Sequence, residues 1–245
     1  MLEDTNNLQS LQELRKGVKQ LANLEQAKNL QRFFKTGKGE YGEGDVFLGI
    51  KVPQQRIIAK KYNDLNFNEL QSLLDSKIHE ERLIALLILV SQYKKAKKDA
   101  LKKRRIFEFY IENANKGNIN NWDLVDLSAP NIVGEFLQKE DTWILKKLAN
   151  SNNIWERRIA ILSTYTFIKK NSFGETLSIS EMLINDKHDL IHKAVGWMLR
   201  EVGKKNKNVL EVFLQQRHKT MPRTMLRYSI EKFPQEERKR WMEKD

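Results

Sequence analysis

The chain repeats one short helical pattern, which is clearest at residues 81–86, ERLIAL. The same order of polar and apolar residues returns at residues 157–162, RRIAIL, and at residues 192–197, HKAVGW. The first two copies are 76 residues apart and the last two are 35 apart. Because 76 is twice 38, a further copy should begin near residue 120.

The segment near residue 120 meets this expectation. Residues 120–126, NNWDLVD, predict an asparagine cap followed by a helix, and a weaker copy, PRTMLR, occupies residues 222–227. Helix pairs repeating at this spacing are typical of an α-solenoid of HEAT-like repeats. We therefore predict an all-α protein, a single domain over residues 1–245, curved with a basic concave face. A plain helical bundle with chance similarity between its helices is the alternative.

Composition agrees with a helical fold and narrows the classes of function. Glycine (11) and proline (4) are scarce, and the absence of cysteine excludes thiol nucleophiles, disulfides and cysteine–metal sites. The excess of 44 Lys and Arg over 32 Asp and Glu gives a net charge of +12, which predicts a polyanionic partner such as nucleic acid. The longest apolar run, residues 83–90, is too short to span a bilayer, so we expect a cytoplasmic protein without a membrane partner.

One long loop interrupts the helical pattern near the N-terminus. Five of the eleven glycines fall within residues 37–49, and the segment 36–45 is predicted to be a flexible loop. Helices should resume at Pro53, because proline fits the first turn of a helix.

A basic residue recurs at matching positions of the repeats. Arg82, Arg158, Lys193 and either Arg223 or Arg227 should lie along the inner surface, because stacked repeats align their second helices. Such a stripe suits the backbone of a nucleic-acid duplex. Taken singly, each cation is better explained as a solvated helix residue, and only the periodic recurrence favours the stripe.

The copy near residue 120 differs, because it has acidic residues where its neighbours have a cation. Trp122 and Asp126 are four residues apart and share a helix face. Pro130 removes the N–H that would bond the carbonyl of Asp126, so the helix should kink there. This pattern indicates a site built around a carboxylate and an indole. It is equally compatible with Asp123 and Asp126 offsetting nearby cations or complementing the helix N-terminus.

A second aromatic and basic face is predicted in the segment 193–204. Lys193, Trp197, Arg200 and Lys204 are spaced by four, three and four residues, so they lie on one stripe of a helix. An indole flanked by cations fits a nucleic-acid contact, with the ring on a sugar or base and the cations on phosphates. For Trp155 we favour packing in the core.

Two other groups of residues allow weaker interpretations. The run 94–105 has eight cations in twelve residues, which fits a phosphate contact, a docking patch or a solvated helix end. His188 and His192 are four residues apart, but only Asp189 accompanies them, so we expect surface histidines and no metal site.

These segments together resemble the AlkD-type DNA glycosylases, HEAT-like-repeat proteins of DNA alkylation repair. The similarity runs from about residue 24 to residue 235. Its markers are FLGI at 47–50 with Pro53, WDxVD at 122–126 with Pro130, NIWxxRxAIL at 153–162, and KAxGWxLRE at 193–201.

The resemblance implies a specific activity and specific site residues. The family excises positively charged alkylpurines, such as 3-methyladenine and 7-methylguanine, from duplex DNA by hydrolysis of the N-glycosidic bond, without base flipping. Its catalytic aspartate corresponds to Asp126, and the two tryptophans that hold the deoxyribose correspond to Trp122 and Trp197. Its phosphate-contacting arginine corresponds to Arg158, and Arg200 matches a basic position near the DNA.

The N-terminal part departs from the family pattern. Pro53 matches a loop that touches the opposite strand, whereas the neighbouring Lys51 does not, and Phe33 replaces a tyrosine that lies near the lesion. The segment 36–45 is an insertion. From pattern and resemblance together, the expected DNA contacts are Arg158, Arg200, Lys193, Arg82, Lys204, Lys51, Pro53 and Phe33.

The resemblance implies no metal and no organic cofactor, and a solenoid that wraps DNA suits a monomer. Two other classes of function remain open at this stage. Some relatives bind DNA without glycosylase activity, so a non-catalytic protein that recognises damaged or branched DNA is the alternative. A protein-binding HEAT scaffold is a third interpretation, which the basic stripe disfavours.

Overall fold

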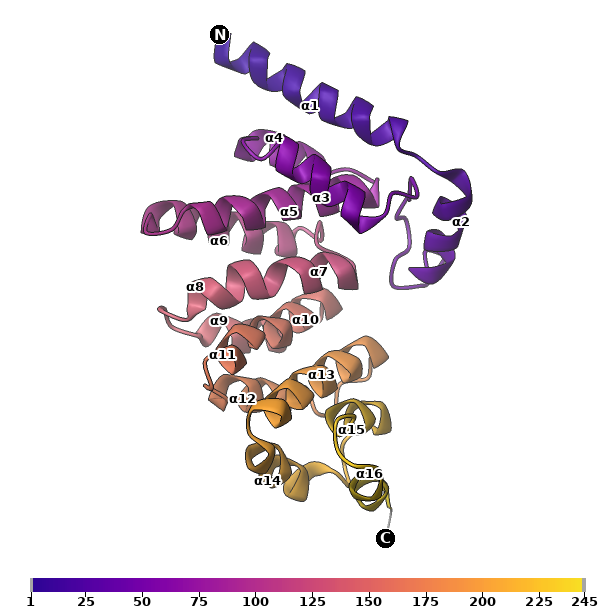
Figure 1. Cartoon of the computed structure of the whole chain (residues 1–245), viewed down its shortest axis with the longest axis vertical. Coiled ribbons are helices and arrows are strands. Elements are labelled where there is room, and N and C mark those ends of the chain that lie inside the picture. Colours follow the sequence, from indigo (N-terminus) through magenta and orange to yellow (C-terminus); the bar gives the residue numbers. More distant parts are fainter. Residues whose placement is uncertain (1, 244–245) are drawn as a thin grey trace. The chain divides into compact units, whose positions relative to one another are not determined.

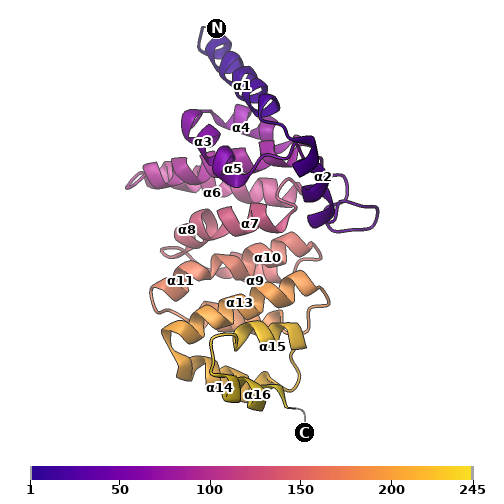
Figure 2. The same cartoon turned by 45° about the vertical axis from the view of Figure 1, so that its right-hand side comes forward.

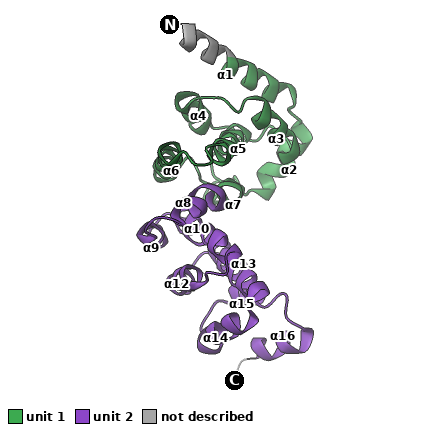
Figure 3. Cartoon of the chain, turned by 60° about the vertical axis from the view of Figure 1, so that its left-hand side comes forward, with its two compact units in different colours: residues 1–128 green, residues 129–245 purple. Residues whose placement is uncertain are grey.

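The computed structural model describes residues 2–243, with side chains described from residue 10 onward. Within this range the chain is helical, and its only β-type pairing is an isolated bridge between Val46 and Ile78. The chain divides into two compact units, residues 1–128 and residues 129–245 (Figure 3). The predicted all-α fold is confirmed, whereas the solenoid curvature, the basic concave face and the single domain stay predictions.

Unit 1 is formed by helices that lead up to residue 128 (Figure 1). They are α1 (Leu2–Gln20), α2 (Leu24–Phe33), α3 (Val52–Lys61), α4 (Phe67–Leu74), α5 (His79–Lys95), α6 (Ala100–Asn115) and α7 (Trp122–Ala129). The predicted loop separates α2 from α3, and Pro53 lies in the first turn of α3 as expected.

Helix α5 is the centre of unit 1. Its apolar run, residues 83–90, is buried on all sides, as expected of a helix that is hydrophobic around its whole circumference. It packs against α3 and α4, which precede it in sequence, and against α6, which follows it. None of the helices among the described residues is long and apolar enough to cross a membrane.

Unit 2 contains the remaining helices. They are the π-helical segment η1 (Pro130–Gly134), α8 (Glu135–Leu137), α9 (Trp143–Ala149), α10 (Ile154–Ser163), α11 (Tyr165–Lys169), α12 (Gly174–Met182), α13 (Asp189–Lys205), α14 (Lys207–Arg217), α15 (Arg223–Ser229) and α16 (Gln235–Met242). Figure 2 shows α10, α13 and α15 side by side, and α13 packs against both of the others.

The close packing of α13 and α15 depends on Gly196. A Cβ atom at this position would lie 2.5 Å from the carbonyl oxygen of Met225, which is too close for any side chain. The repeat copy HKAVGW therefore needs a glycine beside Trp197, because the next helix crosses at backbone distance.

The helices predicted from the repeats are confirmed. The copies lie in α5, α7, α10, α13 and at the start of α15. The side-chain oxygen of Asn121 accepts the N–H of Trp122 at 2.9 Å, so an asparagine does cap α7. The helix changes at Pro130 from α to π geometry, so the regular α-helical pattern ends at this proline, and the predicted kink stays a prediction.

Candidate functional site

Unit 1 contains a cavity of about 400 Å³ that is walled largely by aromatic side chains. This volume lies in the range of pockets that hold small molecules. Helix α2, the segment before α3, and the first turns of α3, α5 and α7 contribute to it. The aromatic and acidic residues most relevant to its chemistry are Phe33, Phe34, Phe47, Trp122 and Asp126.

The aromatic wall is a stack centred on Phe34. Its ring lies parallel to that of Trp122, with centroids 5.0 Å apart and planes 6° apart, and it stacks on Phe47 at 4.9 Å. Phe33 meets Trp122 edge to face at 5.9 Å and is 63% exposed. These contacts hold the indole in one orientation, because aromatic pairs prefer these two geometries.

Helix α7 brings Trp122 and Asp126 to the same cavity, one turn apart, as their spacing predicted. Asp126 is half-buried. Asp123 behaves differently, since it is buried and bonds His79. Of the two interpretations left open for these acids, pairing with a cation therefore holds for Asp123, whereas Asp126 lines the cavity.

The negative charge of Asp126 affects the pKa of Tyr110, a tyrosine buried in unit 1. Burial raises the pKa of Tyr110, and although its hydrogen bond with Ser128 opposes this, the negative charge of Asp126 adds to it. The two hydroxyl oxygens of Tyr110 and Ser128 are 2.9 Å apart. The hydroxyl of Tyr110 therefore stays protonated.

A charged network lies beneath the aromatic wall. The Nδ1 atom of His79 is 3.1 Å from Asp45, and its Nε2 atom is 2.9 Å from Asp123. The ring is 1% exposed and stacks on Phe47 at a centroid distance of 4.4 Å. Burial disfavours the charged ring, but Asp123 and Asp45 outweigh it and raise the pKa of His79 to about 9.

Arg82 belongs to this internal network. It is 6% exposed, and its Nη2 atom lies 2.6 Å from Asp45. The amide of Asn121 donates to the same carboxylate at 3.2 Å. A phosphate contact needs an accessible guanidinium, so this placement does not support the predicted role of Arg82 in binding DNA and favours a structural one.

The edge of the cavity is fixed by a buried acid, Glu80. Its carboxylate accepts the backbone N–H groups of Leu48, Gly49 and Ile50 at 3.0, 2.8 and 3.2 Å. Gly49 has φ +85°, and a Cβ there would lie 2.2 Å from the carbonyl oxygen of Asn23. Only glycine fits at position 49, because its Cα lies so close to the backbone of Asn23 that no Cβ atom can be accommodated.

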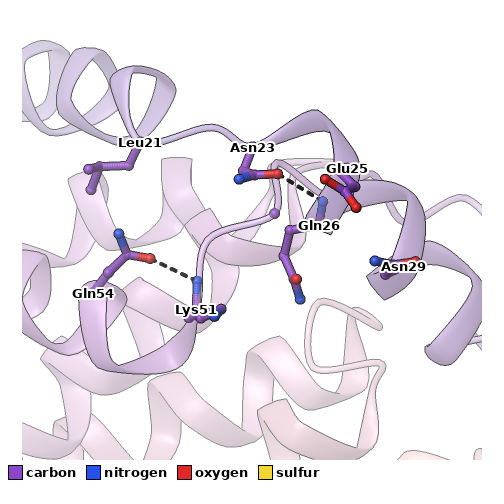
Figure 4. Close-up of a pocket in the computed structure, with 8 residues that line it drawn as sticks. Leu21, Asn23, Glu25, Gln26, Asn29, Lys51 and Gln54 are labelled. Atoms are coloured by element: carbon purple, nitrogen blue, oxygen red, sulfur yellow. Dashed lines mark hydrogen bonds between the residues drawn. The ribbon is translucent and has the colours of Figure 1, made fainter.

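The segment that follows presents Lys51 at the start of α3. The backbone N–H of Lys51 donates to the side chain of Gln54 at 3.2 Å, and its own side chain is exposed (Figure 4). Lys51 and Gln26 line both the aromatic cavity and a second, polar pocket of about 480 Å³. Lys51 thus lies at the rim of the cavity, and Pro53 is exposed in the adjoining turn.

In unit 2, the face predicted along α13 gathers around one acid, Glu201. The Nε1 atom of Trp197 donates to its carboxylate at 3.2 Å, and Lys204 approaches the same oxygen at 2.7 Å. Arg200 pairs with Glu231 and also approaches Glu201. The sequence interpretation included the cations of this face and omitted the acids that neutralise part of their charge.

Two other predicted DNA contacts in unit 2 have protein partners. Lys193 pairs with Asp189 at 2.6 Å on the exposed side of α13. Arg158 is 5% exposed, and its guanidinium donates to the carbonyl of Leu190 at 2.6 Å, which ties α10 to the start of α13. Trp155 is buried, which confirms its predicted packing role.

The structure thus brings Asp126, Trp122, Phe33 and Lys51 together around one cavity of unit 1. The predicted residues of unit 2 are Trp197, Arg158, Lys193, Arg200 and Lys204. Among the described residues, no cluster of three or more His, Cys, Asp or Glu side chains is placed to hold a metal ion.

An all-helical protein that sets a carboxylate in an aromatic-walled cavity is suited to holding a positively charged group. The chain belongs to the DNA alkylation repair enzyme family, whose sequence profile matches residues 14–233. The resemblance to DNA alkylation repair proteins inferred from the sequence is therefore confirmed.

A solved structure has a similar fold. It is described as a predicted DNA alkylation repair enzyme from Enterococcus faecalis, with a TM-score of 0.65 over 87% of this chain and 97% of that chain. The two sequences are 17% identical, so this likeness concerns the fold. No curated protein matches the chain.

Proposed function

We propose that the protein is a DNA glycosylase that excises positively charged N3- and N7-alkylated purines from duplex DNA. The supporting observation is that Asp126 and Trp122 line one aromatic-walled cavity. Membership of a DNA alkylation repair family supports alkylated DNA as the substrate. The reaction is hydrolysis of the N-glycosidic bond, with 3-methyladenine and 7-methylguanine as representative products.

The role of Asp126 follows from the charges in this reaction. An alkylated purine is already cationic and leaves as a neutral base, so the site needs no general acid. Positive charge develops on the deoxyribose as the bond breaks, and a fixed carboxylate stabilises it and orients the attacking water. At a separation of ~4 Å and an effective dielectric constant of ~20, the attraction is about 4 kcal/mol. This corresponds to about a thousandfold in rate.

The indole of Trp122 would act on this sugar. A tryptophan face attracts a cation by about 0.5 to 2 kcal/mol, and Phe34 holds Trp122 in one orientation for this contact. Trp197 is the second aromatic contact in this proposal. Since charge is stabilised at the sugar, the base need not leave the helical stack, and we propose excision without base flipping.

DNA positioning is assigned to exposed and half-buried basic residues, together with Pro53. Lys51 and Pro53 are accessible beside the cavity, and Lys193, Arg200 and Lys204 lie on α13. Phosphates would have to compete with the acids that pair these α13 cations in the unbound protein. We expect the protein to act as a monomer without a cofactor.

The test is base release from alkylated duplex DNA by the wild type and by Asp126→Asn, which keeps the shape and removes the charge. Asp64→Asn is the matched control, because Asp64 is an exposed acid of unit 1 outside the cavity. We expect about a thousandfold slower release by Asp126→Asn and an unchanged rate for the control. If Asp126→Asn releases the base as fast as Asp64→Asn and the wild type do, Asp126 has no role in the mechanism. Duplex binding without release by the wild type would instead support a non-catalytic DNA-binding protein.

A further inference from the structure

A third depression of unit 1 lies between α3 and α5, with a volume of about 460 Å³. We call it the α3–α5 groove. Its rim and floor are formed by Arg56, Ala59, Lys60, Leu87, Val90, Ser91, Lys94, Lys95 and Lys97. Five of these nine residues are cations and none is acidic, so the groove is strongly positive.

The cations of the groove come from two helices that are separated in the sequence. Arg56 and Lys60 lie on α3, whereas Lys94 and Lys95 end α5 and Lys97 follows it. Among residues 10–243, none of the five forms an ion pair, in contrast to the α13 cations of unit 2. The groove therefore holds concentrated positive charge that no described carboxylate neutralises.

The floor of the groove is apolar. Ala59, Leu87 and Val90 are buried residues that form it, and Ser91 adds a hydroxyl. A rim of cations around an apolar floor matches the sugar-phosphate backbone, whose anionic oxygens alternate with apolar sugar faces.

The basic run 94–105 divides in the structure between this groove and aromatic partners. The Nζ atom of Lys103 lies 4.9 Å from the ring centroid of Tyr93, and the guanidinium of Arg105 lies 5.5 Å from that of Phe67. Lys94, Lys95 and Lys97 instead line the groove. Of the interpretations of this run, the phosphate contact therefore concerns its first three cations, Lys94, Lys95 and Lys97.

The groove and the aromatic cavity share the same two helices. Helix α5 begins at the cavity with His79 and reaches the groove with Lys94, and α3 contributes Gln55 to the cavity and Arg56 to the groove. Fifteen residues of α-helix rise about 22 Å. The groove therefore begins beside the cavity at Arg56, and its Lys94 end lies about 22 Å from His79 along α5. A duplex held at both places would meet that end of the groove away from its damaged nucleotide.

We propose that the α3–α5 groove binds phosphates of duplex DNA remote from the lesion. This rests on the proposed DNA substrate and adds a contact surface to it. Because the groove would touch backbone only, its contribution to affinity is the same for undamaged and alkylated duplexes. It sets how strongly the protein holds DNA, and leaves discrimination of the lesion to the cavity.

The experiment measures duplex affinity over a range of salt concentrations for the wild type and for Lys60→Gln/Lys94→Gln. Each phosphate contact contributes about 0.9 to the slope of log affinity against log salt. We expect the double variant to lower that slope by about 1.8, equally for undamaged and alkylated duplexes. Lys60→Arg/Lys94→Arg, which retains both charges, should keep the wild-type slope.

The matched control is Lys16→Gln/Lys19→Gln, which removes two exposed charges of unit 1 from α1. Equal slopes for the groove variant and this control would overturn the groove proposal while leaving the glycosylase proposal intact. A second result would also overturn the groove proposal alone. If the groove variant binds a glutamate-rich peptide more weakly than the wild type does but binds duplex DNA equally well, the groove binds an acidic protein. Absence of any duplex binding by the wild type would overturn both proposals.

Discussion

The Nε2 atom of His79 lies 2.9 Å from Asp123, while Nδ1 lies 3.1 Å from Asp45, so one buried ring bridges two carboxylates. A neutral imidazole has a single N–H, and both carboxylates can accept a hydrogen bond only when the ring is charged. The imidazolium thus bonds the first turn of α7 to the segment before α3. Because Trp122 and Asp126 lie on α7, we infer that His79 helps to fix the position of both residues through Asp123.

This arrangement predicts how stability depends on pH. Burial disfavours the charge, but Asp123 and Asp45 raise the pKa of His79 to about 9 in the folded protein. The pKa in the unfolded chain is about 6.5. The stabilisation is therefore complete below pH ~6.5 and is lost as the pH rises through ~9. We expect the free energy of unfolding, measured with urea, to fall by about 3 kcal/mol across this window.

The control for this prediction is His79→Gln, which retains hydrogen bonding and removes the titration. This variant should be less stable than the wild type at the acidic end of the window, because Asp45 and Asp123 lose their shared cation. Its unfolding free energy should then change little as the pH rises. A variant with the same pH dependence as the wild type would show that other groups cause it.

Gly49→Ala should destabilise unit 1 and impair base release. The added Cβ meets the carbonyl oxygen of Asn23 at 2.2 Å, in addition to the strain of φ +85°. Gly39→Ala is the matched control, because Gly39 has φ +80° and nothing within 4 Å of its added Cβ. We expect about 1 kcal/mol for Gly39→Ala and clearly more for Gly49→Ala in thermal unfolding. Equal losses would mean that close approach at Gly49 is unimportant.

The sequence predicted those features that depend on local spacing. The spacing of the repeats predicts the helix α7 from copies at least 35 residues away, and the segment 120–126 predicts that an asparagine caps it. Pro130 marks the residue where the α-helix gives way to π geometry. The spacing of Trp122 and Asp126 placed both on one face, and the structure confirms that they line one cavity. Each of these inferences uses contacts within a turn or two of one helix, where periodicity determines geometry.

Features that depend on contacts distant in sequence were missed. Arg82 and Arg158 have the periodicity of a surface stripe, but both are buried against partners that the spacing does not reveal. The cavity itself is closed by Phe34 and Phe47, which stack on each other across the glycine-rich loop. Periodicity indicates which residues share a helix face, but it does not indicate which distant residues pack against that face.

Trp122→Leu tests the aromatic contact with the sugar. Leucine keeps an apolar residue beside Phe34 and removes the face that attracts a cation. A loss of about 0.5 to 2 kcal/mol corresponds to base release between about twofold and thirtyfold slower. Trp143→Leu is the control, since Trp143 is exposed in unit 2. Unchanged release by Trp122→Leu would mean that the indole only fills space.

Arg82→Ala and Lys193→Ala should separate structural cations from DNA-binding ones. Arg82 is buried, and its Nη2 atom lies 2.6 Å from Asp45. Because Arg82→Ala removes one of the cations that pair with this buried carboxylate, we expect it to lower the free energy of unfolding by about 3 to 5 kcal/mol.

Lys193 pairs with Asp189 on an exposed surface, where the ion pair contributes about 1 kcal/mol or less. Urea unfolding should therefore distinguish the two variants strongly. Duplex affinity, measured where both variants are folded, should show the reverse order, with Lys193→Ala weakened and Arg82→Ala similar to the wild type. Weaker DNA binding by folded Arg82→Ala would restore this arginine to the DNA contacts, because burial in the free protein would then not prevent it from reaching a phosphate.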